Sequence, residues 1–279
     1  MPNYLPIHRK IQVLNALVEG ASICSISRMT GVNKRTILKL LCEAGEKASE
    51  VMDREIVNVK AKFVQCDEIW CFVGKKQKQL TELERMNEGK GDQYIWVAMD
   101  ADSKLVISYR VGKRNSPNAR SIMKDLAYRI PSRFQLSTDS FLPYYDAVDH
   151  VFGADIDYGT IHKNYMEEVI KPRRYSPPQV MGVSMELVTG NPVRGRICTS
   201  HVERQNLTMR MQMRRLTRLT NAFSKKLTNL QAAVALHFFH YNFMRIHQSL
   251  RVTPAMEAKV TMRLWNWGHL LGVNQSQAA

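Results

Sequence analysis

The 279-residue chain lacks the sequence signals of several protein classes. Its five cysteines are scattered and none lies in the C-x-x-C spacing typical of zinc and redox sites, so we expect free thiols. Residues 1–10 carry no apolar run that could act as an export signal. The longest apolar stretch, residues 232–243, is interrupted by two histidines and an asparagine, whereas a membrane helix needs about 20 apolar residues. The sequence therefore predicts a cytoplasmic protein with no membrane partner.

Acidic residues are scarce in the second half of the chain. The whole sequence has 40 Lys and Arg against 25 Asp and Glu, a formal charge of +15. Between Lys171 and Arg251, 14 Lys and Arg are accompanied only by Glu186 and Glu203, so this stretch supplies +12 of the total. A solubilising surface usually mixes both signs, whereas a nucleic acid binds more tightly with every cation that displaces a condensed counterion. The charge pattern therefore favours a nucleic-acid partner.

Residues 1–48 show the pattern of a small helix-turn-helix domain. Apolar residues at helical spacing predict a helix over residues 8–19, and residues 25–41 predict a short helix, a tight turn at Gly31 and a second helix. In such motifs the start of the second helix enters the major groove. A helical hairpin used only for packing is the alternative interpretation. The candidate DNA-binding residues are Asn33, Lys34, Arg35, Thr36 and Lys39.

The apolar period changes near residue 60. Residues 45–59 are charged and helical in propensity but show no convincing buried face, so we expect a linker over residues 49–60. Beyond it the pattern predicts an α/β domain over residues 61–255, with a mixed sheet and helices on both faces, followed by a C-terminal tail over residues 256–279. The predicted strands cover 63–73, 94–99, 105–111 and 134–138, and the predicted helices cover 117–129 and 143–152.

Three carboxylates occupy informative positions in the predicted α/β domain. Asp67 lies in mid-strand among apolar neighbours, Asp139 ends a strand, and Glu203 begins a helix expected to continue through Arg215. Arg210 follows Glu203 by seven residues, so both side chains would share one helical face. Each signal alone is typical of a capping residue or an ion pair. Several carboxylates together would suit magnesium, which prefers oxygen ligands.

Taken together, the segments around these acids resemble insertion-sequence transposases of the IS1 type. These belong to the DDE group, whose catalytic domain has an RNase H-like fold. The resemblance covers most of residues 63–226, and its most specific part is the His-Val-Glu-Arg-Gln-Asn-Leu core at residues 201–207. Residues 241–255 resemble the closing segment of many DDE transposase and integrase cores. The matching segments are 67–74, 94–100, 138–144 and 196–226.

The resemblance implies metal-dependent DNA strand cleavage and strand transfer of an insertion sequence. Asp67, Asp139 and Glu203 would bind two Mg²⁺ ions, for which Mn²⁺ is expected to substitute, and Arg210 would assist at the substrate phosphate. The partners would be element ends, target DNA and further copies of the chain, in a homodimer or larger synaptic complex associated with the nucleoid. The further candidate DNA contacts are Arg173, Arg174, Arg204, Asn206, Arg214, Arg215 and Arg218.

Several points stay open in the sequence. Family members often carry an N-terminal zinc-binding module, and its cysteines are lacking here. The basic, Pro/Gly-rich segment 166–200 is either a solvated insertion or a DNA-contacting loop. Glu68 should point to the opposite side of its strand from Asp67, so we do not expect it to be a ligand. A transposase-derived DNA-binding regulator and a metal nuclease without strand transfer are the alternative functions, although the three intact acids argue against the regulator.

Overall fold

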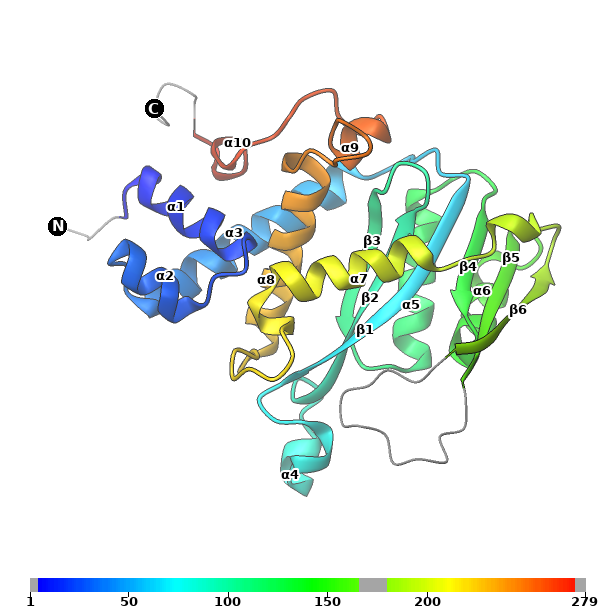
Figure 1. Cartoon of the computed structure of the whole chain (residues 1–279), viewed down its shortest axis with the longest axis horizontal. Coiled ribbons are helices and arrows are strands. Elements are labelled where there is room, and N and C mark those ends of the chain that lie inside the picture. The colour runs from blue at the N-terminus through cyan, green and yellow to red at the C-terminus, as the bar shows by residue number, and fades with distance from the viewer. Residues whose placement is uncertain (1–4, 166–179, 274–279) are drawn as a thin grey trace.

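A six-stranded mixed sheet organises the computed structural model of the chain, which describes residues 5–165 and 180–273 (Figure 1). The order across the sheet is β3-β2-β1-β4-β5-β6. β1 pairs antiparallel with β2 and parallel with β4, so it lies inside the sheet. The strands are β1 (Phe63–Val73), β2 (Gly91–Asp100), β3 (Val106–Gly112), β4 (Gln135–Asp139), β5 (Asp157–Tyr165) and β6 (Val180–Thr189).

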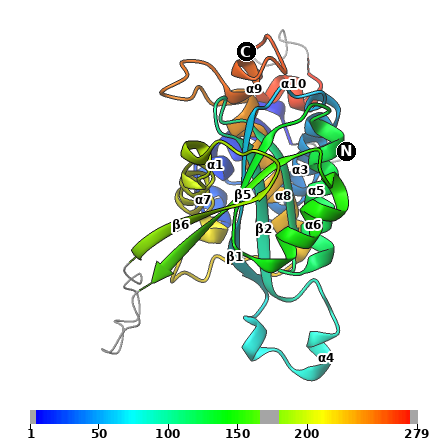
Figure 2. The ribbon, with the colours of Figure 1, turned by 90° about the vertical axis from the view of Figure 1, so that its right-hand side faces the viewer.

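Helices cover both faces of the sheet. Figure 2 shows α7 on one side of the strands and α5 and α6 on the other. This mixed α/β arrangement confirms the predicted sheet with flanking helices and is consistent with an RNase H-like fold. The helices are α1 (Ile7–Val18), α2 (Ile23–Thr30), α3 (Lys34–Glu55), α4 (Glu82–Arg85), α5 (Ser116–Arg129), α6 (Leu142–Phe152), α7 (Ser200–Gln212), α8 (Leu227–Phe239), α9 (Pro254–Glu257) and α10 (Trp267–Leu271).

Capping residues fix the ends of the N-terminal helices. The Ser22 hydroxyl accepts a hydrogen bond from the Ser25 amide at 3.0 Å and starts α2. Gly31 ends α2 with a φ of 70°, a conformation that glycine adopts without strain. The side chain of Asn33 then accepts from the Arg35 amide at 2.9 Å and starts α3. The tight turn between α2 and α3 therefore lies at Gly31, as predicted.

The expectation that residues 45–59 lack a buried face is wrong. α3 continues through Glu55 and buries Gly45, Ala48, Val51 and Met52. It packs against α8 so closely that a Cβ on Gly45 would lie 2.6 Å from the Ala232 Cα. The sequence pattern hides this face because a close helix contact is built from small residues, which read as weakly apolar. Whether a domain boundary lies at residue 48 stays a prediction.

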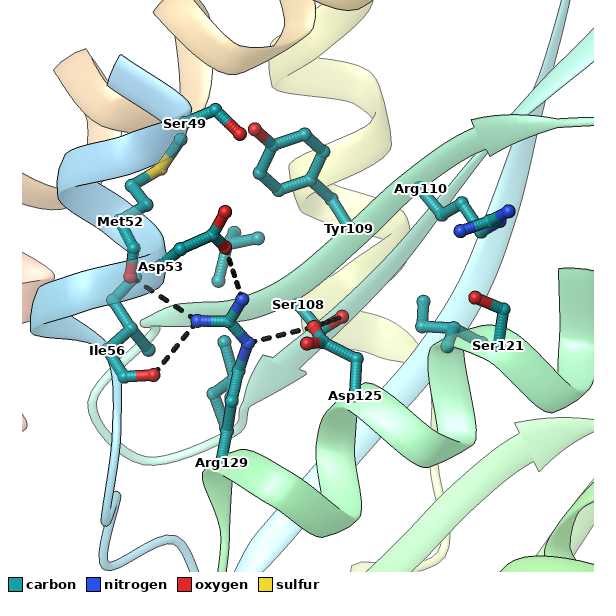
Figure 3. Close-up of a pocket in the computed structure, with 13 residues that line it drawn as sticks. Ser49, Met52, Asp53, Ile56, Ser108, Tyr109, Arg110, Ser121, Asp125 and Arg129 are labelled. Atoms are coloured by element: carbon teal, nitrogen blue, oxygen red, sulfur yellow. Dashed lines mark hydrogen bonds and ion pairs between the residues drawn. The ribbon is translucent and has the colours of Figure 1, made fainter. Parts of the chain in front are cut away.

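Arg129, the last residue of α5, connects α5 to the C-terminal end of α3. Figure 3 shows its guanidinium between α3 and α5, bonded to carboxylates and to main-chain oxygens at the end of α3. The distances are 2.5 Å to Asp53, 2.8 Å to Asp125 and 2.9 Å to the Ile56 carbonyl oxygen. Because the last carbonyls of a helix lack partners within the helix, a buried cation there satisfies them and favours the helix dipole.

The chain between α6 and α7 differs from the expected insertion. Residues 180–189 form β6, which pairs antiparallel with β5 at the edge of the sheet. Alternating apolar residues in β6, from Met181 to Leu187, carry the strand signal, but their neighbours Gly182 and Ser184 weaken it. Residues 190–200 complete the described part of the expected insertion, and Lys171, Arg173 and Arg174 lie outside the described residues.

The described residues of the C-terminal part of the chain, up to residue 273, pack against the rest of the protein. Trp265 and Trp267 are buried, and Trp267 donates a hydrogen bond from its indole to the side chain of Asn15 in α1. α10 thereby lies against the N-terminal helices (Figure 1). Over the ranges 5–165 and 180–273, no helix combines the length and apolar character needed to cross a bilayer.

Candidate active site

The two predicted aspartates come from neighbouring parallel strands. Gln65 of β1 pairs with Ser137 of β4, so Asp67 and Asp139, each two residues farther along, occupy corresponding positions. Glu203 approaches from the first turn of α7, the helix that covers this part of β1. The register of these parallel strands thus places Asp67 beside Asp139, and α7 adds Glu203 from the face of the sheet.

Asp67 is the partly buried centre of this group. Burial raises its pKa to about 7, and the negative charges of Glu68, Asp139 and Glu203 add to the increase. Its Oδ2 atom accepts a hydrogen bond at 2.8 Å from Nδ2 of Asn206, one turn after Glu203 on α7. The other polar atom of that amide, Oδ1 of Asn206, is buried without a hydrogen-bond partner among the described residues. Within the described part of the chain, a buried carbonyl oxygen therefore lies without a hydrogen-bond partner beside the carboxylate of Asp67.

Asp139 is more open and is held from two directions. Its Oδ1 atom accepts from the Phe141 amide at 3.1 Å, and its Oδ2 atom accepts from Arg114 at 3.4 Å. The Asp139 side chain is 39% exposed, which leaves it accessible to a ligand. Because α6 begins only three residues later, the carboxylate lies close to a helix N-terminus, where negative charge is favoured.

Glu203 is bound by a hydroxyl and a cation. Thr199 donates to its Oε1 atom at 2.5 Å, and Lys163 of β5 forms an ion pair with the same oxygen. Its place in the first turn of α7 stabilises the negative charge through the helix dipole. α7 itself ends at Gln212, before the predicted Arg215, and residues 214–216 turn into a short 3₁₀ helix.

A fourth carboxylate, Glu68, lies beside the three predicted ones. It contacts Tyr144 of α6, whereas Asp67 contacts α7, so the two side chains do point to opposite sides of β1. Burial and then the charge of Asp139 raise the pKa of Glu68, while Arg114 and Tyr144 act in the other direction. The signal that selected Asp67, an acid in mid-strand, applied equally to Glu68.

Arg210 shares the helical face of Glu203 but not its surroundings. Burial lowers its pKa, followed by the charge of Arg218, and Cys71 acts against them. Seven residues correspond to a rise of about 10 Å along a helix, so two side chains on one face can still lie far apart. The cations that contact the acids are instead Arg114 and Lys163, which no sequence motif marked.

The donor chemistry of the site suits a hard divalent cation. Carboxylate oxygens and an unsatisfied amide oxygen are the ligands that Mg²⁺ prefers. Within residues 5–165 and 180–273, however, no three His, Cys, Asp or Glu side chains already converge closely enough to enclose an ion. Ion pairs with Arg114 and Lys163 engage Asp139 and Glu203. Oxygen donors are thus present, but the described side chains do not enclose an ion in this arrangement.

The candidate DNA-binding residues divide into exposed and inward-facing ones. At the start of α3 the candidates from Asn33 to Lys39 are all exposed, with Asn33 also serving as the helix cap. Arg215 is half-buried and donates to Ser224 at 2.9 Å, and Asn206 is buried at Asp67. The other candidates described after Asp139, which are Arg204, Arg214 and Arg218, are exposed.

Lys34 and Arg214 line the same surface pocket. Both line a pocket of about 560 Å³ that lies between the N-terminal helices and the segment after α7. Leu17, Leu38 and Phe223 contribute apolar walls. The two groups of candidate DNA contacts are therefore neighbours in space although 180 positions separate these two residues in the sequence.

Comparisons with known proteins add little to this geometry. No protein-family model and no curated protein matches the chain. Among solved structures, it is similar to one described as the Mos1 transposase paired-end complex with left transposon end, at 12% identity and a TM-score of 0.22. The match covers 57% of this chain and 60% of that one, so this chain spans less than two thirds of that structure's length. The functional interpretation rests on the site and not on this likeness.

Proposed function

We propose that the chain is a DNA transposase that cleaves the ends of an insertion sequence and joins them to target DNA. The observation that carries the proposal is the burial of Asp67 among the charges of Glu68, Asp139 and Glu203, which raises its pKa to about 7. Such an arrangement costs folding free energy, and acids of this kind cluster at functional sites. A bound divalent cation would offset that cost.

Asp67, Asp139 and Glu203 are the proposed metal ligands, and Oδ1 of Asn206 is a further oxygen within the same group. Two Mg²⁺ ions, or Mn²⁺ in their place, would polarise the phosphodiester and activate the attacking oxygen. The chain's own contribution is to hold the carboxylates on a rigid strand pair and a helix. Lys163 would release Glu203 as the site closes.

The chemistry proceeds in two displacements at phosphorus. Water attacks the phosphodiester at an element end, the bond from phosphorus to the 3′ oxygen breaks, and a free 3′-hydroxyl remains. That hydroxyl then attacks a phosphodiester of the target DNA, with departure of the target's own 3′ oxygen. The exposed cations at the start of α3 and after α7 would hold the DNA backbone and supply affinity. Pairing two element ends requires at least two copies of the chain.

The first experiment compares the wild-type chain with Glu203→Gln on DNA that flanks the coding sequence at its source locus, with Mg²⁺ and Mn²⁺. We expect joined products from the wild type and none from the variant, while both bind the DNA. Glu257→Gln is the matched control, because Glu257 is an exposed acid on the distant helix α9. The control should join DNA as the wild type does.

The other outcomes identify the alternatives. Hydrolysis without joined products by the wild type would indicate a metal nuclease. DNA binding without cleavage by either protein would indicate a regulator, and would contradict the proposed role of the carboxylates.

A further inference from the structure

Arg114 is the cation placed among the acids of the candidate site. It follows β3 and lies just before α5, which Asn115 caps. Its Nε atom donates to Oε1 of Glu68 in an ion pair, and its Nη2 atom donates to Oδ2 of Asp139 at 3.4 Å. The guanidinium also lies over the ring of Phe141, 3.6 Å from the ring centroid. Three contacts on three sides thus define its position.

The ion pair with Glu68 fixes the position of Arg114. The side chain of Glu68 is only 2% exposed, and its second oxygen accepts a hydrogen bond from the hydroxyl of Tyr144 at 2.8 Å. Tyr144 is itself fully buried. An ionised carboxylate in such a place is costly without a cation, and Arg114 supplies that charge. The buried pair therefore keeps the guanidinium at the edge of the site whether or not a ligand is present.

Donors of Arg114 remain for a ligand. A guanidinium carries five N–H donors in a planar fork, and the contacts described use Nε and one hydrogen of Nη2. The Arg114 side chain is 35% exposed, so the unused donors can reach a molecule bound beside Asp139. A planar fork matches two non-bridging oxygens of a phosphodiester better than an ammonium group does.

We propose that Arg114 is a catalytic residue that binds the non-bridging oxygens of the phosphodiester being cleaved, and that Glu68 and Tyr144 are its positioning residues. This inference rests on the proposed function and names a substrate contact within the same site. Arg114 touches a proposed ligand, whereas the electrostatic neighbours of Arg210 are Arg218 and Cys71. Negative charge grows on those oxygens in the transition state, so the contact is expected to act mainly on the rate of the chemical step.

The test measures single-turnover DNA cleavage and, separately, the rise in melting temperature on addition of Mn²⁺. Arg114→Ala should slow cleavage by about a hundredfold, the loss typical of removing one donor at the developing charge, with little change in DNA affinity. Arg114→Lys should recover only a small part of that rate. Stabilisation by Mn²⁺ should persist in both variants, because Arg114 is not a ligand. Arg120→Ala, an exposed arginine of α5 paired with Asp146, is the matched control and should change neither quantity.

Removal of Arg114 leaves Glu68 buried without its cation, so a second pair of variants guards against unfolding. Glu68→Gln removes the buried charge, keeps an oxygen for Tyr144, and should slow cleavage less than Arg114→Ala does. The double variant should cleave at the rate of Arg114→Ala, because Glu68 acts through Arg114.

Four results would overturn the inference. The first is that Arg114→Ala cleaves as fast as the wild type. The second is that Arg114→Ala loses Mn²⁺ stabilisation together with cleavage, because Arg114 would then only hold Asp139 in place. Additive losses in the double variant would show that Glu68 acts by another route. A wild-type chain that neither cleaves nor gains stability from Mn²⁺ would overturn the proposed function and this contact with it.

Discussion

Asp67 occupies a position where an ionised side chain weakens the fold. Burial, and then the negative charge of Glu68, raise its pKa from 3.8 to about 7. Below about pH 4 the residue is protonated in the folded and unfolded chains alike. Between about pH 4 and pH 7 the unfolded chain loses this proton and the folded chain keeps it, so the free energy of unfolding falls as the pH rises through that window. Above pH 7 the full cost is present.

Asp67→Asn should therefore stabilise the metal-free protein at pH 8, by on the order of 2 kcal/mol, and have little effect at pH 4. Urea unfolding of both proteins at the two pH values measures the difference. Addition of Mn²⁺ at pH 8 should reverse the order, because only the wild type can bind the ion through this carboxylate. Equal stability differences at both pH values would show that the fold does not raise the pKa of Asp67.

The residues of the site were accessible to sequence reasoning to different degrees. Asp67 and Asp139 stand at strand positions that a pattern can identify, and the motif around Glu203 marks the third acid. Arg114 and Lys163 carry no such signal, since each reaches its carboxylate from 25 and 40 positions away, respectively. Their role depends on which strands become neighbours.

The sequence predicted closely those elements whose apolar or β-forming residues give a clear local pattern. It did not predict elements whose extent depends on packing against other parts of the chain. β1 covers the predicted residues 63–73, because eleven residues rich in β-branched and aromatic side chains favour a strand on their own. α3 was predicted too short, because its second half owes its buried face to α8. β6 was missed, since a strand at the edge of a sheet buries little and its pattern is weak.

The close approach of α3 and α8 predicts the effect of one methyl group. Gly45→Ala would place a Cβ 2.6 Å from both the Cα and the carbonyl oxygen of Ala232, and backbone atoms cannot rotate away. Alanine favours a helix over glycine by about 1 kcal/mol, but overpacking should cost more and leave a net destabilisation of about 1–3 kcal/mol. Urea unfolding midpoints measure the change.

Gly195→Ala is the control for that experiment, since a Cβ there would meet no atom within 4 Å. It should leave the midpoint nearly unchanged. A stabilised Gly45→Ala variant would mean that helix propensity dominates and that α3 and α8 are farther apart than described.

Charge is distributed unevenly over the whole molecule. Residues 134–162, which span β4, α6 and most of β5, contain no Lys or Arg, whereas the exposed candidate cations lie at the start of α3, on α7 and after it. A molecule of net charge +15 should turn the surface that carries these cations toward a polyanion, and turn residues 134–162 away from it. DNA should therefore approach from the side of α7 and the N-terminal helices.

Binding to a duplex of arbitrary sequence should weaken steeply as salt rises, because each neutralised phosphate releases a counterion. Replacing Arg214 and Arg218 by alanine should reduce the slope of log K against log salt by about 0.9 for each phosphate that the variant no longer neutralises. Fluorescence anisotropy at several salt concentrations measures the slope. Arg120→Ala, which removes an arginine paired with Asp146, should leave the slope unchanged. An unchanged slope in the double variant would place the DNA elsewhere on the molecule.

The sequence by itself determined the properties that depend on local pattern and on composition. These are the strand β1, the capped turn at Gly31, the basic character of the chain and the positions of the three acids. Only the tertiary structure decided what surrounds those acids, because the neighbours of a buried carboxylate come from distant parts of the chain. The order of strands in the sheet brings Arg114 and Lys163 to the acids, and no local pattern specifies that order.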